Sequence, residues 1–292
     1  MKKQTGCFLA LVLTLAAGTA QADFNLGAGD YLVSTYHHKG DTYNVSRAYI
    51  LSGGYVDYLY AHDSSTVNLS GGYVGRLYTI ATSTVNMSGG DMGTLDARDS
   101  STVNVSGGYA DDLDALGSSR VNLSNGSVYA IGAYGSSTVD FSGGSVNYLY
   151  VFNSSTVDLS AGDVGSLVID SATPGYFSTV NISGGYVDRL TTVGRSTTVN
   201  LSGGDVGSLT VSDSSTIIFD ARNFHLGSGL TLDGQRVLGT GILGGEWFDG
   251  TSWSVNITAN DPGAMIEIVP EPATLGLLAL GGLALLRRRK GQ

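Results

Sequence analysis

The sequence predicts an all-β protein wound as a right-handed parallel β-helix. The first observation is a serine before a glycine-rich corner, which recurs mostly every 18 residues, at Ser52, Ser70, Ser88, Ser106, Ser124, Ser142, Ser160, Ser183 and Ser202. The second is that apolar residues keep fixed places within each repeat. The third is that Gly, Asp, Asn and Ser fill the places between them. A period of this length is typical of stacked units that cannot bury an apolar face alone.

Each repeat offers about five inward positions. Val67 and Leu69 are two residues apart and therefore share one face of a strand. After the glycines, Val74, Leu77 and Thr79 define three further positions, which other repeats fill with Val, Leu and small or branched residues. We expect about nine turns, stacked about 4.8 Å apart. The coil should be right-handed because parallel crossovers almost always are.

Two other solenoids have periods that divide 18 but do not fit the residues. A left-handed hexapeptide helix needs an apolar residue at every sixth position, whereas steps of six from Val67 reach Tyr73 and Thr79. The calcium-binding nonapeptide needs Gly and Asp where Val74 and Arg76 stand. Both alternatives are therefore excluded.

The N-terminal residues 1–22 have the pattern of a secretory signal peptide. A basic start and an apolar run precede Ala20 and Ala22, which form an A-x-A cleavage site around one glutamine. The single cysteine, Cys7, would leave with this segment, so the mature chain would hold no disulfide. We expect export through the general secretion machinery.

The mature chain divides into four predicted parts. Residues 23–47 fit the repeat poorly and would form an N-terminal cap, because the open apolar end of a solenoid has to be closed. Residues 48–222 carry the repeats. Residues 223–268 contain Trp247, Trp253 and a hairpin signal, and are predicted to form a C-terminal β cap.

The last part, residues 269–292, has three features in a fixed order. These are Val269-Pro270-Glu271-Pro272, an apolar run over 273–286, and the cluster Arg287-Arg288-Arg289. Fourteen helical residues would measure about 21 Å, which is short of the roughly 30 Å hydrocarbon core of a bilayer. The basic cluster should stay on the cytoplasmic side.

This C-terminal arrangement resembles the PEP-CTERM sorting signal of Gram-negative bacteria, on which an exosortase acts. The resemblance implies export, transient anchoring in the inner membrane through 273–286, and removal of the tail. It also implies release to the cell surface or matrix of a cell that makes exopolysaccharide. The repeats over 48–220 are similar in style to autotransporter adhesin passengers, but that similarity transfers no functional residue.

The charge excludes one class of partner. The chain has a net charge of −10, and removal of the signal peptide and tail takes away six of 15 basic and one of 25 acidic residues, which leaves −15. An acidic surface without a basic patch repels DNA and RNA, so we predict no nucleic-acid binding.

In-register stacking predicts one acidic cluster. Asp96 and Asp114 should lie side by side on adjacent turns, with Asp111 and Asp112 nearby. Close carboxylates raise a pKa or attract a cation, and such groups act as acid and nucleophile in glycosidases. One hypothesis is therefore a polysaccharide lyase or hydrolase with these four catalytic residues, and with calcium at Asp96 and Asp114. The favoured interpretation is a solvated acidic face without catalysis or a cofactor.

Two outward columns complete the prediction. Asn68, Asn86, Asn104 and Asn122 should form a ladder of amides that hydrogen-bond along the rod. Tyr55, Tyr73 and Tyr109 form a tyrosine column, which would suit a glycan-binding adhesin. The primary prediction is an exported structural protein of the cell surface or extracellular matrix that associates with exopolysaccharide.

Overall fold

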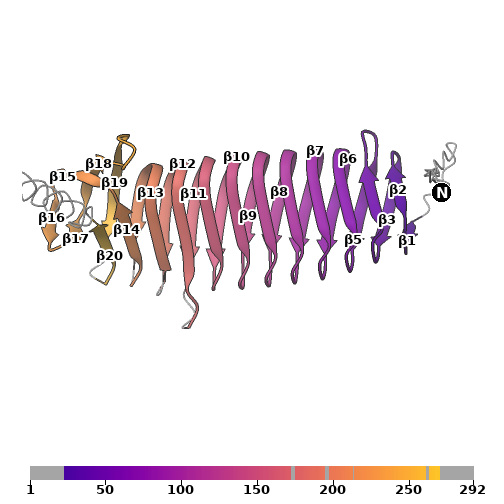
Figure 1. The fold of residues 1–292 in the computed structure, drawn as a ribbon, viewed down its shortest axis with the longest axis horizontal. Helices are drawn as coiled ribbons and strands as arrows, with labels where there is room; N and C mark the ends of the chain where they lie inside the picture. Colours follow the sequence, from indigo (N-terminus) through magenta and orange to yellow (C-terminus); the bar gives the residue numbers. More distant parts are fainter. Residues whose placement is uncertain (1–22, 172–174, 195–196, 213, 261–262, 270–292) are drawn as a thin grey trace, which may run out of the picture.

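The computed structural model describes residues 23–171, 175–194, 197–212, 214–260 and 263–269, and it forms one parallel β-solenoid (Figure 1). The described residues contain strands and turns and no helix. The chain makes about 11 turns of about 18 residues. The predicted fold class is confirmed, and the predicted count of about nine turns is too low.

The central coils repeat one pairing scheme. Val67 lies beside Val85, and Leu77 lies beside Leu95, in parallel register on neighbouring coils. Each strand continues past the glycine corner with a register shift there. The strands are β6 (Thr66–Thr79), β7 (Thr84–Ala97), β8 (Thr102–Ala115), β9 (Arg120–Ala133), β10 (Thr138–Phe152), β11 (Thr156–Asp170), β12 (Ser178–Val193) and β13 (Thr197–Val211).

Both ends add strands to the predicted turns, and the N-terminal segment continues the coil itself. Tyr36 pairs with Tyr55 and Thr42 with Ala61, so the solenoid register begins before residue 48. The repeat was hidden there because Gly40 replaces an inward leucine, and the ring of Phe24 fills the space that a Cβ on Gly40 would need. The strands are β1 (Phe24–Leu26), β2 (Asp30–Val33), β3 (Tyr36–Thr42), β4 (Arg47–Ile50) and β5 (Tyr55–Ala61).

Aromatic rings close the C-terminal end of the core. Trp253 stacks on Phe219 and on Trp247, with ring centroids 4.8 Å apart in both pairs. Antiparallel hairpins carry these tryptophans, while β19 and β20 add parallel strands to β13 and β14. The strands are β14 (Thr216–Asp220), β15 (Arg222–Leu226), β16 (Leu230–Asp233), β17 (Arg236–Gly239), β18 (Gly241–Glu246), β19 (Ser252–Asn260) and β20 (Met265–Val269).

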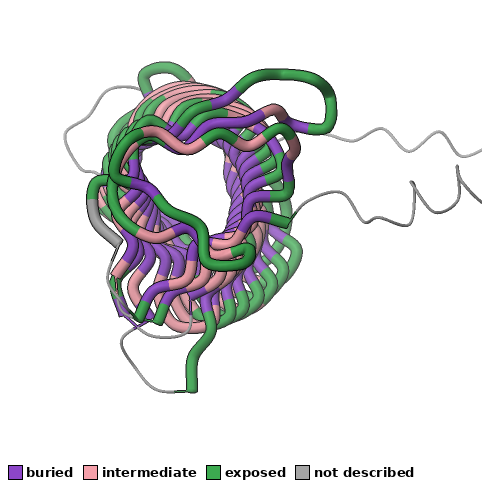
Figure 2. Tube along the Cα trace, turned by 90° about the vertical axis from the view of Figure 1, so that its left-hand side faces the viewer, coloured by how far each residue is buried: buried purple, intermediate pink, exposed green. Residues whose placement is uncertain are grey.

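The buried residues line the inside of the coil along its length (Figure 2). Val67, Val85 and Val103 are fully buried, as their register predicted. Burial of five apolar side chains per turn, at roughly 1.5–3 kcal/mol each, supplies the main stabilising term.

The asparagine ladder is confirmed on the outer surface. Asn86 donates to Asn68 at 3.0 Å, Asn104 to Asn86 at 2.9 Å, and Asn122 to Asn104 at 2.7 Å. The two inner amides, Asn86 and Asn104, each donate and accept one such bond, which pairs their half-buried polar atoms. The same column resumes where Asn181 donates to Asp158 at 2.7 Å.

Candidate functional site

The predicted acidic cluster forms only in part. Asp96 on β7 and Asp114 on β8 are direct register partners, and Asp112 lies two residues before Asp114 on the same face of β8. Asp111 instead accepts a hydrogen bond from the Tyr109 hydroxyl, and this bond is the main reason why the pKa of Tyr109 is raised. The structure therefore brings three of the four predicted carboxylates to one face.

The paired carboxylates have different environments. Burial, followed by the charges of Asp96 and Asp112, raises the pKa of the half-buried Asp114 carboxyl. Asp96 accepts a 2.7 Å hydrogen bond from Nη2 of Arg98, whose guanidinium lies 5.4 Å from the centre of the Tyr78 ring. The charge of Asp96 is thus compensated. The sequence signal for this ion pair is the two-residue spacing, which places both side chains on one face of a strand.

The acidic cluster offers few metal ligands. Across the part of the chain that the structure describes, no group of three or more His, Cys, Asp and Glu side chains is arranged to hold a metal ion. Calcium takes 6–8 oxygen ligands, so an ion between Asp96 and Asp114 would need most of its ligands from elsewhere.

We predict that Asp114→Asn increases stability slightly at pH 7 and not below pH 3.8. A raised folded-state pKa means that the native state binds the proton more tightly, so ionisation of Asp114 destabilises the fold as pH rises above the usual value of 3.8. The asparagine removes this penalty. Urea unfolding of both proteins at pH 3 and pH 7 measures the difference. An equal gain at both pH values would show that charge is not the cause.

The tyrosine column is shorter than predicted at one end and longer at the other. The Tyr55 and Tyr73 rings pack 4.9 Å apart, and Tyr36 extends the column because its ring stacks 5.1 Å from that of Tyr55. Asp91 occupies the next position, between Tyr73 and Tyr109. Tyr55, Tyr73 and Tyr109 therefore share one column of the coil, as predicted, but Asp91 separates the Tyr109 ring from the other two.

A hollow of about 430 Å³ lies beside this column. It spans β3, β5 and β6 on three adjacent coils, and it brings together side chains up to 38 positions apart in the sequence, from His38 to Arg76. The residues that line it are His38, Tyr55, Asp57, Tyr58, Tyr73, Gly75 and Arg76. Sequence reasoning singled out Tyr55 and Tyr73 and missed the others, although the parallel register was enough to place Arg76 beside Tyr58.

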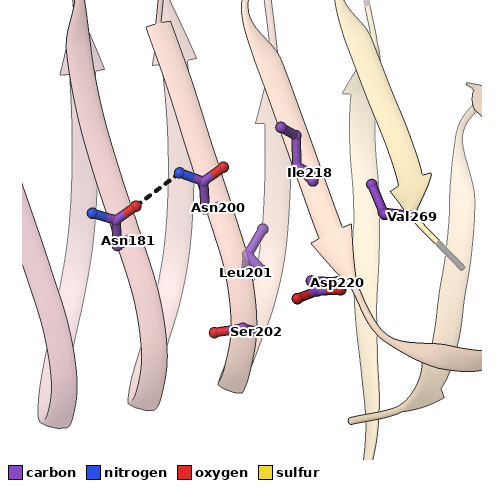
Figure 3. A pocket seen from close by; sticks show the side chains of 7 residues that line it. All are labelled: Asn181, Asn200, Leu201, Ser202, Ile218, Asp220 and Val269. Carbon is purple, nitrogen blue, oxygen red and sulfur yellow. Dashed lines mark hydrogen bonds between the residues drawn. The ribbon is translucent and has the colours of Figure 1, made fainter. Parts of the chain in front are cut away.

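A second hollow, of about 410 Å³, lies where the rod meets the predicted sorting motif (Figure 3). Asn200 donates to Asn181 at 2.7 Å on its wall, and Val269 lies beside Asp220 on the neighbouring strand. Val269, the first residue of the motif, is thus the last residue of β20. Pro270, Glu271, Pro272, the run over 273–286 and the arginine cluster lie outside the described residues, as do Ala20 and Ala22.

Comparison with known proteins identifies the C-terminal segment. Residues 269–290 match the family model described as the PEP-CTERM protein-sorting motif. No curated protein and no solved structure shows significant similarity to the chain. The chain is therefore a β-solenoid that ends in a PEP-CTERM sorting signal, which marks it for export and surface sorting through an exosortase.

The described residues include no helix that is long and apolar enough to cross a membrane. The predicted membrane segment 273–286 falls outside them.

Proposed function

We propose that this protein is a structural rod that an exosortase releases to the cell surface or extracellular matrix, where it associates with exopolysaccharide. The junction at Val269 carries this proposal. This residue both ends the last strand of the solenoid and begins the sorting motif, so the solenoid is the part that processing would release. Transient anchoring through 273–286 would hold the rod at the inner membrane until then.

The acidic surface and the asparagine ladder suit a protein that is located outside the cell. A strongly negative net charge keeps a long rod soluble and separate from its copies. The ladder satisfies polar groups along the surface without a cofactor or disulfide. A polysaccharide enzyme built on Asp96 and Asp114 is the weaker alternative, because the Arg98 ion pair already compensates Asp96.

Processing is tested by intact mass and cell fractionation in the native host. We expect the released protein to lack Arg287–Arg289 and the Glu271→Gln variant to stay full-length in the membrane fraction. Glu267→Gln is the matched control, because Glu267 lies on β20 just before the motif. Released protein that keeps Arg287, or identical behaviour of both variants, would contradict processing through this signal.

Matrix association has its own measurement. The released rod should be retained by washed extracellular matrix from wild-type cells and lost from cells that cannot make exopolysaccharide. Equal retention in both would contradict the association. Release of new reducing ends from the polysaccharide, abolished by Asp114→Asn, would support the enzyme instead.

A further inference from the structure

We propose that the hollow formed by β3, β5 and β6 is a binding site for a neutral sugar unit of a polysaccharide. This inference rests on the proposed association with exopolysaccharide and names the surface and the chemical class of the ligand. The hollow has three features that suit a sugar: a fixed acceptor, a donor with several N–H groups, and aromatic rings beside them.

The fixed acceptor is the Asp57 carboxylate. The Tyr36 hydroxyl donates to Oδ2 of Asp57, and Nδ1 of His38 lies 2.9 Å from the same oxygen. These two bonds lower the pKa of Asp57, and the bond from Tyr36 raises the pKa of that tyrosine to about 12. Asp57 is therefore ionised and held in place at neutral pH.

The donor is the Arg76 guanidinium, which carries five N–H groups. Arg76 lies on β6 directly beside Tyr58 of β5, and its side chain bonds to Tyr78. Among the residues that the structure describes, no carboxylate forms an ion pair with it. Asp57 and Arg76 thus place an acceptor and a donor in one hollow.

The tyrosines supply the apolar surface. Tyr55 and Tyr58 are 38% and 37% exposed, so part of each ring is open to a ligand. Asp91 follows Tyr73 in this column, so the next coil places a carboxylate and not a ring beside the far face of Tyr73. Gly75 lets β6 lie close against β5 at the hollow, since a Cβ there would lie 2.7 Å from the Asp57 carbonyl oxygen.

These features fit a neutral sugar better than an acidic one. Sugar hydroxyls both donate and accept, so adjacent hydroxyls can satisfy Asp57 and Arg76 together, while an apolar sugar face packs on a tyrosine. A uronate would meet Arg76 but also the Asp57 charge and a chain of net charge −10. The observations therefore favour a glycan without carboxylates.

The chain contains its own matched control. Tyr186 and Arg189 on β12 occupy the same positions of the coil as Tyr73 and Arg76. They lack the neighbours that form the hollow, because the preceding coil offers Asp163 and Ser166 instead of tyrosines. A general effect of removing a surface tyrosine or arginine would appear equally at both places.

Affinity electrophoresis of the released rod tests the site, in native gels that contain soluble glucan, mannan, galactan or polygalacturonate. We expect at least one neutral glycan to retard the protein more than polygalacturonate does. Tyr73→Ala and Arg76→Gln should raise the dissociation constant at least tenfold, whereas Tyr186→Ala and Arg189→Gln leave it unchanged. Circular dichroism confirms that each variant is folded.

Two results would overturn the site, and both are distinct from failure of the proposed function. They are no retardation by any neutral glycan, and equal losses at both pairs of positions. If the rod is retained in the matrix but Tyr73→Ala leaves the dissociation constant unchanged, the proposed site is wrong and the proposed function stands. If the rod binds glycan in the gel but is absent from the matrix, the proposed site stands and the proposed matrix association is wrong.

Discussion

Replacing Gly108 with alanine is expected to lower the free energy of unfolding by roughly 2–4 kcal/mol. Gly108 is the second glycine of its corner and has a φ of +87°, which alanine adopts only with strain. A Cβ there would lie 2.5 Å from the carbonyl oxygen of Gly90 and 2.9 Å from the carbonyl carbon of Gly89. Both are backbone atoms of the coil below, which cannot rotate away.

The matched control is Gly107→Ala, one residue earlier. Ala161 already occupies the equivalent position in another coil, and neither residue has a positive φ. A Cβ on Gly107 would lie 2.6 Å from the carbonyl oxygen of Ser88, so both variants meet backbone of the preceding coil and only Gly108→Ala adds the left-handed strain. We expect a smaller loss than for Gly108→Ala, because only the second glycine of the corner has a positive φ. Urea unfolding followed by circular dichroism measures both. Equal losses would show that the corner does not depend on the left-handed conformation of its second glycine.

Phe141→Ala is expected to cost about 3–5 kcal/mol, the usual range for removal of a buried phenylalanine. Phe141 is 1% exposed and lies between Leu123 and Leu159 in its inward column. Its ring reaches to 3.0 Å from the place that a Cβ on Gly162 would take. Because the coils above and below are tied by hydrogen bonds, they cannot collapse into the space left by the ring.

Two variants make the test specific to the interior. Phe141→Leu restores the residue that the neighbouring coils carry and should recover much of the loss. Tyr148→Ala removes a ring of similar size from the outer face of the same strand, where it is 39% exposed, and should cost under about 1 kcal/mol. Thermal and urea unfolding give the ranking. A loss for Tyr148→Ala as large as that for Phe141→Ala would contradict the assignment of faces.

The repeated part of the fold could be predicted from the sequence because the same pattern of apolar residues and corner glycines recurs in each of its coils. Val67 and Leu69 mark a strand by alternation, and the second corner glycine marks a bend. The first coils were not predicted because their inward residues are irregular. Gly40 and Phe24 share the space that a leucine fills elsewhere. Periodicity detects identical residues in a column, and it does not detect two residues that fill one position jointly.

The proposed binding surface was less predictable for a related reason. Register alone brought Asp96 to Asp114 and Asn68 to Asn86, since these contacts need only the backbone. The bonds from Tyr36 and His38 to Asp57 depend on side-chain rotamers and on the coils before residue 48. A site formed by different residues from three coils leaves no repeated signal in the sequence.

Because the register is uniform, one coil could be removed or added without changing how the remaining coils stack. Thr66, Val67 and Asn68 recur as Thr84, Val85 and Asn86 and again as Thr102, Val103 and Asn104. Deleting the 18 residues 84–101 would place Val103 directly beside Val67 and Asn104 beside Asn68, so the valine column and the asparagine ladder would continue. Gene duplication or loss of one unit would thus lengthen or shorten the protein in steps of about 4.8 Å, while both ends stay as they are.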